Sequence, residues 1–239
     1  MKEYGILLDT TFCTGCNSCT YRCIQEFRYH NQASRGLFRT FVQINDGGLY
    51  HKRCMHCIDP ECVKNCPVEA LKKSGYGPVL YDAKICVGCK TCAEVCPYGA
   101  PQFDEVTEKI VKCSLCAHRV GEGKQPACVE VCSTGALEFG EYSVIREKAK
   151  NISNKSGLYT YGLEEAGGAH FIVVSKESPI SAGYPKPVKK AVKSSHVPSG
   201  NSIAVPAIAA IAMGGFMKFS DRVERIKMEE EKKNEKERS

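Results

Sequence analysis

Alternating hydrophobic and polar positions predict several short strands in the first half of the chain. Turn-forming residues flank each of them, and they cover Gly5–Asp9, Phe41–Ile44, Pro78–Asp82 and Pro101–Phe103. Short helices are expected over Asn17–Tyr29, Pro60–Asn65 and Lys90–Val95. Short strands interspersed with short helices indicate an α+β fold.

The second half of the chain has a different pattern. It predicts a short helix over Glu141–Lys150, a buried strand over Ala169–Val174 and an extended connector over Ser178–Ser202. The fifteen residues Ile203–Met217 carry no charge and predict an apolar helix over 203–219. At about 1.5 Å per residue this stretch spans roughly 22 Å, less than the roughly 30 Å of a bilayer core. Membrane insertion and burial against a partner subunit therefore both remain open.

These patterns divide the chain into four segments. Residues 1–141 form the predicted main domain, 142–202 an extension and linker, 203–219 the apolar helix with a possible role as a membrane anchor, and 220–239 a charged tail. Charged residues make up 25% of the chain and apolar residues 43%, which excludes wholesale disorder.

The 16 cysteines all lie between Cys13 and Cys132. A disulfide framework is disfavoured, because Met1–Thr11 contains no apolar run of the length a secretion signal needs. The cysteines form four sets, which we number in chain order: Cys13, Cys16, Cys19 and Cys23; Cys54, Cys57, Cys62 and Cys66; Cys86, Cys89, Cys92 and Cys96; Cys113, Cys116, Cys128 and Cys132.

The spacing within the sets is typical of iron–sulfur ligands. The first and third sets read C-x2-C-x2-C-x3-C, the run of bacterial ferredoxins, and a proline follows Cys66 and Cys96 as in that run. In those proteins three cysteines of one loop and a distant fourth hold a cubane cluster. Structural zinc also uses C-x2-C pairs, but three cysteines within seven residues suit a cubane better. We therefore expect four [4Fe-4S] clusters, with iron as the metal bound.

The sets also repeat in sequence. Residues 11–23 match 84–96, and residues 60–71 match 126–137, which indicates two fused bacterial-type 2[4Fe-4S] ferredoxin units. Only 19 residues separate the second set from the third, which suits one unit and leaves the first and fourth sets to close the other. Sequential pairing of the sets remains possible.

Nested pairing would give each cluster three cysteines of one set and the last cysteine of another. Cluster 1 would be held by Cys13, Cys16, Cys19 and Cys132; cluster 2 by Cys54, Cys57, Cys62 and Cys96; cluster 3 by Cys86, Cys89, Cys92 and Cys66; and cluster 4 by Cys113, Cys116, Cys128 and Cys23.

The chain resembles a known family both in two of its cysteine runs and in two stretches outside them. The stretches that carry the resemblance are 54–67, 113–140, 161–175 and 182–189, the last two reading YGLEEAGGAHFIVVS and AGYPKPVK. The chain resembles the four-cluster electron-transfer subunits of molybdenum or tungsten oxidoreductases of the dimethyl sulfoxide reductase family. Within that group it is most similar to the iron–sulfur (beta) subunit of membrane-bound formate dehydrogenases.

The resemblance implies nested ferredoxin units, a catalytic partner that carries a pterin-bound metal, and a haem or quinone subunit in the membrane. The chain itself would catalyse no bond chemistry and would relay single electrons within a membrane-associated complex. In the family, such a subunit can be exported with its catalytic partner, so the side of the membrane stays open. Close alternatives are the equivalent subunit of an arsenate, polysulfide or thiosulfate reductase or of a hydrogenase, and a more distant one is a soluble polyferredoxin.

Charge adds little evidence for other partners. The formal charge of +6 falls to about −2 once thiolates and oxidised cluster cores are counted, and no nucleotide-binding or nucleic-acid-binding motif is present. Four side chains beside the ligand loops, those of Lys90, Lys112, Arg119 and His56, are candidates for raising cluster potentials. The alternative is a solvated surface charge or, for His56, a hydrogen-bonded loop residue.

Overall fold

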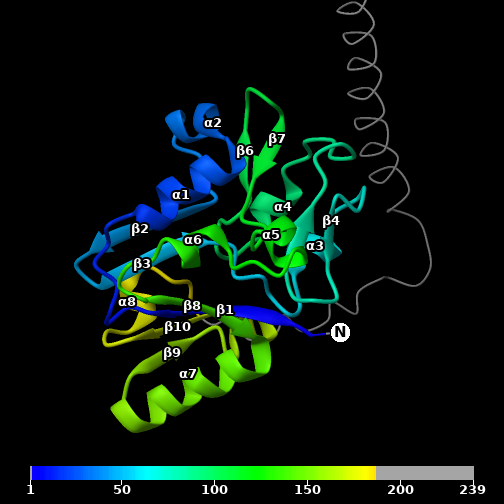
Figure 1. Cartoon of the computed structure of the whole chain (residues 1–239). Helices are drawn as coiled ribbons and strands as arrows, with labels where there is room; N and C mark the ends of the chain where they lie inside the picture. The colour runs from blue at the N-terminus through cyan, green and yellow to red at the C-terminus, as the bar shows by residue number, and fades with distance from the viewer. Residues whose placement is uncertain (1, 187–239) are drawn as a thin grey trace, which may run out of the picture. The chain divides into compact units, whose positions relative to one another are not determined.

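A four-stranded sheet joins segments from both ends of residues 2–186, the part of the chain that the computed structural model describes (Figure 1). Strand β1 (Tyr4–Asp9) pairs antiparallel with β8 (Leu137–Glu141) and parallel with β10 (Phe171–Ser175). Strand β9 (Tyr159–Tyr161) pairs with the other side of β10. The N-terminal strand therefore lies between segments from much later in the chain.

The alternation of β1 gives the sheet two buried faces. Leu7 packs against Ile145 of α7 (Tyr142–Ser156), which covers one face. Ile6 and Leu8 point the other way, into the core that contains the cysteines. Figure 1 shows α7 on one side of the sheet and the remaining helices and hairpins mainly on the other. The sheet thus forms one wall of the cysteine-rich region.

Three two-stranded hairpins lie on that side. They are β2 (Thr40–Asn45) with β3 (Gly48–Arg53), β4 (Leu71–Lys73) with β5 (Val79–Tyr81), and β6 (Gln102–Asp104) with β7 (Lys109–Val111). Strand β3 ends directly before Cys54, and β7 ends two residues before Cys113. The hairpins therefore hold the start of two ligand loops.

The helices on the cysteine side are short. They are α1 (Ser18–Phe27), α2 (His30–Ser34), α3 (Glu61–Lys64), α4 (Thr91–Glu94), α5 (Ala117–Gly121), α6 (Ala127–Glu130) and α8 (Pro179–Ala182), and a 3-10 turn covers Glu165–Gly167. Asn17, before α1, adopts a left-handed conformation that asparagine tolerates well. Its Oδ1 accepts a hydrogen bond from the Val42 N–H at 2.9 Å and thus ties the first ligand loop to β2.

The α+β pattern expected from the sequence is confirmed in outline. All four predicted strands of the first half occur with ends shifted by at most two residues, as do the cores of the three predicted helices. The predicted helix 141–150 is longer, reaching Ser156, and the predicted strand 169–174 is Phe171–Ser175. Of the ten strands in residues 2–186, the prediction missed β3, β4, β7, β8 and β9. In β3, the polar residues His51 and Arg53 on the buried face weaken the hydrophobic alternation.

Two expectations concern the segments that follow the first domain. Segment 142–186 adds strands β9 and β10 to the sheet that contains β1, and its helix α7 covers one face of that sheet. The expected boundary at residue 141 stays a prediction. The apolar helix expected over 203–219 and the tail 220–239 lie outside the described residues. Among residues 2–186, no helix has the length and apolar character to cross a membrane.

Candidate iron–sulfur sites

The first cavity gathers cysteines from the first and fourth sets. Cys13 and Cys16 of the loop between β1 and α1, and Cys19 of the first turn of α1, line it together with Cys132. Its empty space is about 390 Å³, part of it open to solvent. The loop and the first turn of α1 contribute three cysteines, and the segment that follows α6 contributes the fourth.

A second cavity repeats this arrangement with the other two sets. Cys86, Cys89 and Cys92 line it together with Cys66, around about 350 Å³ of empty space. Cys66 also accepts a hydrogen bond from the Ala70 N–H at 3.2 Å. Three cysteines of the third set and the last cysteine of the second set therefore share one site.

The remaining cysteines lie in two more enclosed groups. Burial raises the pKa of the Cys23 thiol well above its usual value, and neighbouring thiolates raise it further. These neighbours are Cys113, Cys128 and Cys116. Cys23, from α1, therefore lies among the first three cysteines of the fourth set.

The fourth group has the same composition. Burial raises the pKa of the Cys57 thiol, and the charges of nearby thiolates add to this rise. The neighbours are Cys54, Cys96 and Cys62. The last cysteine of the third set thus lies near the first three of the second set.

Backbone N–H groups point at several of these sulfur atoms. Leu115 N–H donates to Cys113 Sγ at 3.4 Å, and Ala127 N–H donates to Cys116 Sγ at 3.4 Å. Such donors stabilise thiolates and tune the potentials of iron–sulfur clusters. Within residues 2–186, no three His, Cys, Asp or Glu side chains converge closely enough for a single metal ion. In the two cavities described above, four cysteines instead line a space, as the ligands of a multi-iron cluster do.

Several buried polar atoms beside the cysteines have no partner among the described protein groups. They are His51 Nδ1, Arg53 Nε and His56 Nε2. The other nitrogen of each imidazole ring lies near sulfur: His51 Nε2 is 3.9 Å from Cys19 Sγ, and His56 Nδ1 is 3.7 Å from Cys54 Sγ. Buried donors usually have an acceptor. Arg53 Nε belongs to the guanidinium group that contacts Cys113 and Cys128, and the sulfides of a bound cluster are acceptors of a suitable kind, so the residues present fit this cofactor.

Three cationic side chains reach into the region of the clusters. Arg53 is 3% exposed, and its Nη2 donates to Cys113 Sγ at 3.3 Å. Lys112 is also 3% exposed, and its Nζ donates to the carbonyls of Val79 at 2.6 Å and Cys113 at 2.7 Å. Lys73, half-buried, donates to the Cys57 carbonyl at 2.7 Å. Positive charge near the sulfur atoms offsets the negative charge of cysteine-bound clusters.

The four side chains singled out in the sequence divide into two kinds. Lys90 forms an exposed ion pair with Glu105 at 2.6 Å, as a surface charge does. Arg119 pairs with carboxylates rather than with sulfur. Lys112 is buried near the ligands, and His56 is fully buried with Nδ1 accepting the Val79 N–H at 3.0 Å. The sequence reasoning missed Arg53, although a charged residue on the inward face of a strand next to Cys54 is a usable signal.

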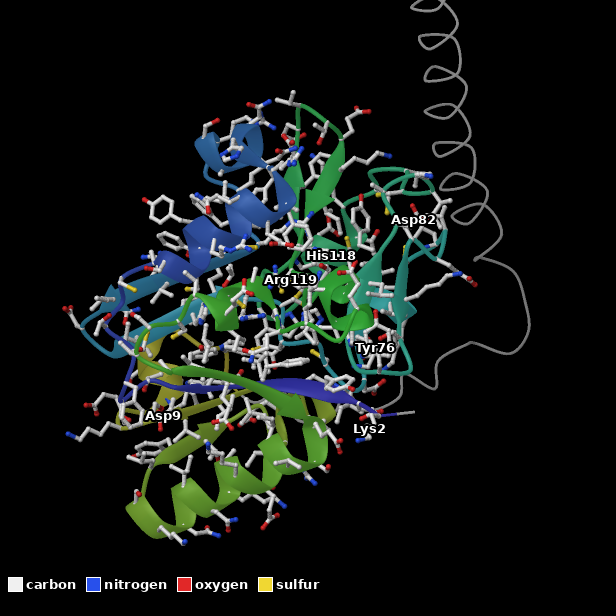
Figure 2. The ribbon with its side chains drawn as sticks, in the orientation of Figure 1. Lys2, Asp9, Tyr76, Asp82, His118 and Arg119 are labelled. Atoms are coloured by element: carbon white, nitrogen blue, oxygen red, sulfur yellow. The ribbon has the colours of Figure 1, made fainter. Side chains whose placement is uncertain are left out.

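A network of charges joins the three helices around Cys23, Cys116 and Cys128. Glu26 of α1 accepts from Arg119 Nη1 at 3.1 Å and from His118 Nε2 at 2.8 Å, both on α5 (Figure 2). Arg119 Nη2 also pairs with Glu130 of α6 at 2.7 Å. Glu26 and Arg119 are 14% and 12% exposed, so the network is half-buried and holds α1, α5 and α6 together.

Comparison with known proteins adds independent information. Residues 48–142 match a family model described as a 4Fe-4S dicluster domain. One component of the anaerobic dimethyl sulfoxide reductase of Escherichia coli (strain K12) is 37% identical over 166 residues, which are 63% of this chain and 80% of the relative. One component of the tetrathionate reductase of Salmonella typhimurium (strain LT2) is 40% identical over 149 residues, 58% of each protein.

A third relative extends further along the chain. Hydrogenase-2 operon protein HybA of Escherichia coli O157:H7 is 34% identical over 228 residues, covering 72% of this chain and 69% of the relative. These matches agree with the ferredoxin-like mixture of short helices and strands around the cysteine groups. The chain therefore belongs to the family of 4Fe-4S dicluster proteins that includes these components of anaerobic dimethyl sulfoxide reductase and tetrathionate reductase.

Proposed function

We propose that this chain is a non-catalytic electron-transfer subunit that holds four [4Fe-4S] clusters in the nested arrangement. The observation that carries the proposal is the location of Cys66 in one cavity with Cys86, Cys89 and Cys92. In the same way, Cys132 lies in the other cavity with three cysteines of the first set. Pairing of the first set with the fourth and of the second with the third is the pattern that nesting requires. When bound, each cluster would supply one-electron redox chemistry, and the protein holds the clusters close together.

The positions of the sulfur atoms support the cluster order 1–4–2–3. Cys19 of the first set and Cys128 of the fourth set pack in the same buried core, and burial raises the pKa of the Cys19 thiol to about 12, with the charge of Cys128 adding to the rise. This supports clusters 1 and 4 as neighbours. Lys112 contacts the Cys113 carbonyl, and its charge also acts on Cys62, so it lies between clusters 4 and 2.

The packing of Cys62 in the same buried hydrophobic core as Cys92 supports clusters 2 and 3 as neighbours, which completes this order. Burial raises the pKa of the Cys62 thiol to about 12, and Cys92 of the third set is among the thiols that add to the shift. The exposed cysteines, Cys16 and Cys89, belong to clusters 1 and 3. In the proposed order these are the two terminal clusters, where electrons enter and leave.

The partners follow from the proposed role. A relay without catalytic chemistry needs a catalytic partner at one terminal cluster, proposed to carry a molybdenum or tungsten pterin, and an acceptor at the other, proposed to be a membrane haem or quinone subunit. The resemblance of 161–175 and 182–189 favours formate as the partner's substrate. The names of the relatives point instead to dimethyl sulfoxide or tetrathionate reduction, or to a hydrogenase operon. A membrane-associated complex with 203–219 at the membrane is part of the same proposal.

Purification of the native protein with its bound partners tests this function. We expect about 16 iron atoms per chain, a molybdenum or tungsten partner, and formate-dependent reduction of a viologen dye. Reduced-viologen oxidation by dimethyl sulfoxide or tetrathionate without formate activity would retain the electron-transfer role and reject formate. A lone monomer that is soluble without detergent would favour a freely diffusing polyferredoxin, and zinc at a level comparable to iron would reject the cofactor assignment.

A further inference from the structure

Arg53 carries a positive charge at a buried position, next to the second set of cysteines. It is the last residue of β3 and is 3% exposed. The strand alternation directs Arg53 and His51 toward the interior, whereas the intervening Lys52 is only half-buried. Burial of a guanidinium group is unfavourable unless negative charge and hydrogen-bond acceptors compensate it.

The compensating groups of Arg53 are cysteine sulfur atoms. Nη2 lies 3.3 Å from Cys113 Sγ, and Nη1 lies 3.7 Å from Cys128 Sγ. Among the described residues, no ion pair joins Arg53 to a carboxylate. The planar guanidinium therefore directs two N–H groups at two ligands of the same cysteine group, a fork that lysine cannot reproduce.

The plane of this fork is held by the central sheet. The guanidinium carbon of Arg53 lies 4.3 Å from the centroid of the Phe171 ring, and Phe171 is a fully buried residue of β10. The aromatic face favours a cation above it and restricts rotation of the guanidinium. Arg53 is thus fixed between the sheet and the ligands of the fourth set.

We propose that Arg53 sets the reduction potential of cluster 4 by donating hydrogen bonds to two of its cysteine ligands. The proposal rests on the four-cluster function described above. Reduction adds one electron, supplied by an external reductant, and no covalent bond forms or breaks. Because the reduced cluster and its ligands carry more negative charge, an adjacent fixed cation stabilises the reduced state more than the oxidised state and raises the potential.

The test compares variants of the full-length, cluster-loaded protein in anaerobic potentiometric titrations followed by electron paramagnetic resonance. At a fixed potential, we expect Arg53→Met to lower the ratio of reduced to oxidised cluster 4 at least tenfold, a shift of about 59 mV to more negative potential for one electron. Arg53→Lys should give a smaller shift, because the charge remains while the fork is lost. Arg35→Met is the matched control, since Arg35 pairs with Asp104 at 2.6 Å, and should leave all potentials unchanged.

Unchanged potentials in a fully loaded Arg53→Met protein would overturn the proposal. If that variant loses cluster 4, the proposal is tested on the wild-type protein instead. With isotope-labelled arginine nitrogen, hyperfine coupling in the reduced cluster 4 supports the proposal, and absence of coupling rejects it. Iron content distinguishes failure of the proposed function from failure of the Arg53 proposal. Fewer than four clusters in the wild-type chain would contradict the proposed function. Full iron content with an unchanged potential in Arg53→Met would contradict only the role of Arg53.

Discussion

Arg119 of α5 and Glu26 of α1 form an ion pair at 3.1 Å that joins two helices flanking the Cys23 group. Both side chains are largely shielded from water, and His118 and Arg22 also bond to the same carboxylate. A half-buried carboxylate with several charged donors contributes more to stability than an isolated surface ion pair does. The pair is therefore a structural support for the proposed cluster 4.

Glu26→Gln should lower the free energy of unfolding, measured by urea titration, by about 1–2 kcal/mol, because charge-assisted hydrogen bonds are replaced by weaker ones. The His118 hydrogen bond and the nearby arginines lower the pKa of Glu26. A folded-state pKa below the unfolded one stabilises the protein at neutral pH, and this contribution is lost as pH falls through the lowered pKa. The difference in unfolding free energy between the variant and the wild-type protein should thus become smaller at acid pH. Unfolding is followed by the visible absorbance of the clusters. Glu122→Gln, at an exposed ion pair, is the control and should have little effect.

Cys23→Ser and Cys116→Ser should remove the same cluster. Each single variant is expected to lose about four iron atoms per chain, and the double variant no more, because both cysteines are proposed ligands of cluster 4. Iron analysis together with electron paramagnetic resonance of the reduced proteins measures this. In the control pair Cys23→Ser and Cys89→Ser, the losses should add. Additive losses for Cys23 and Cys116 would refute nested pairing.

Gly88→Ala should impair loading of cluster 3. Gly88 lies between Cys86 and Cys89 with φ +71°, and an added Cβ would lie 2.9 Å from the Glu108 carbonyl oxygen. The left-handed conformation costs about 1–2 kcal/mol for alanine, and the close contact with backbone adds to that. Iron per chain after reconstitution is the measurement. Gly121→Ala on α5, where a Cβ meets no atom within 4 Å, should load normally.

Lys73→Met should speed the release of iron to a chelator. Lys73 Nζ donates to the His56 carbonyl at 3.1 Å and the Cys57 carbonyl at 2.7 Å, in the loop of the proposed cluster 2. The His56 carbonyl keeps the His170 N–H as a donor, so the substitution removes the hydrogen bond of the Cys57 carbonyl, which is expected to destabilise the loop by about 1–3 kcal/mol. The neighbouring Lys72→Met is the control, because Lys72 is exposed and pairs with Glu69 at 3.5 Å. Equal release rates in the two variants would contradict this role of Lys73.

Much of the fold could be predicted where the determining interactions are local. The strand at Gly5–Asp9 and the helix after Asn17 follow from alternation and from turn residues within a few positions. Strand β3 could not be found this way, because His51 and Arg53 are polar residues on its buried face. Their burial depends on sulfur atoms and an aromatic ring supplied by distant segments.

The spacing of the cysteines along the chain is enough to indicate the chemistry of the sites, because one short stretch brings three sulfur atoms together independently of the other segments. It left open which distant cysteine joins each loop. The tertiary structure decided that Cys132 lies with the first set and Cys66 with the third, since packing of hairpins and helices against the central sheet brings these segments together. It also decided that Arg53 contacts Cys113, a contact that spacing along the chain cannot indicate.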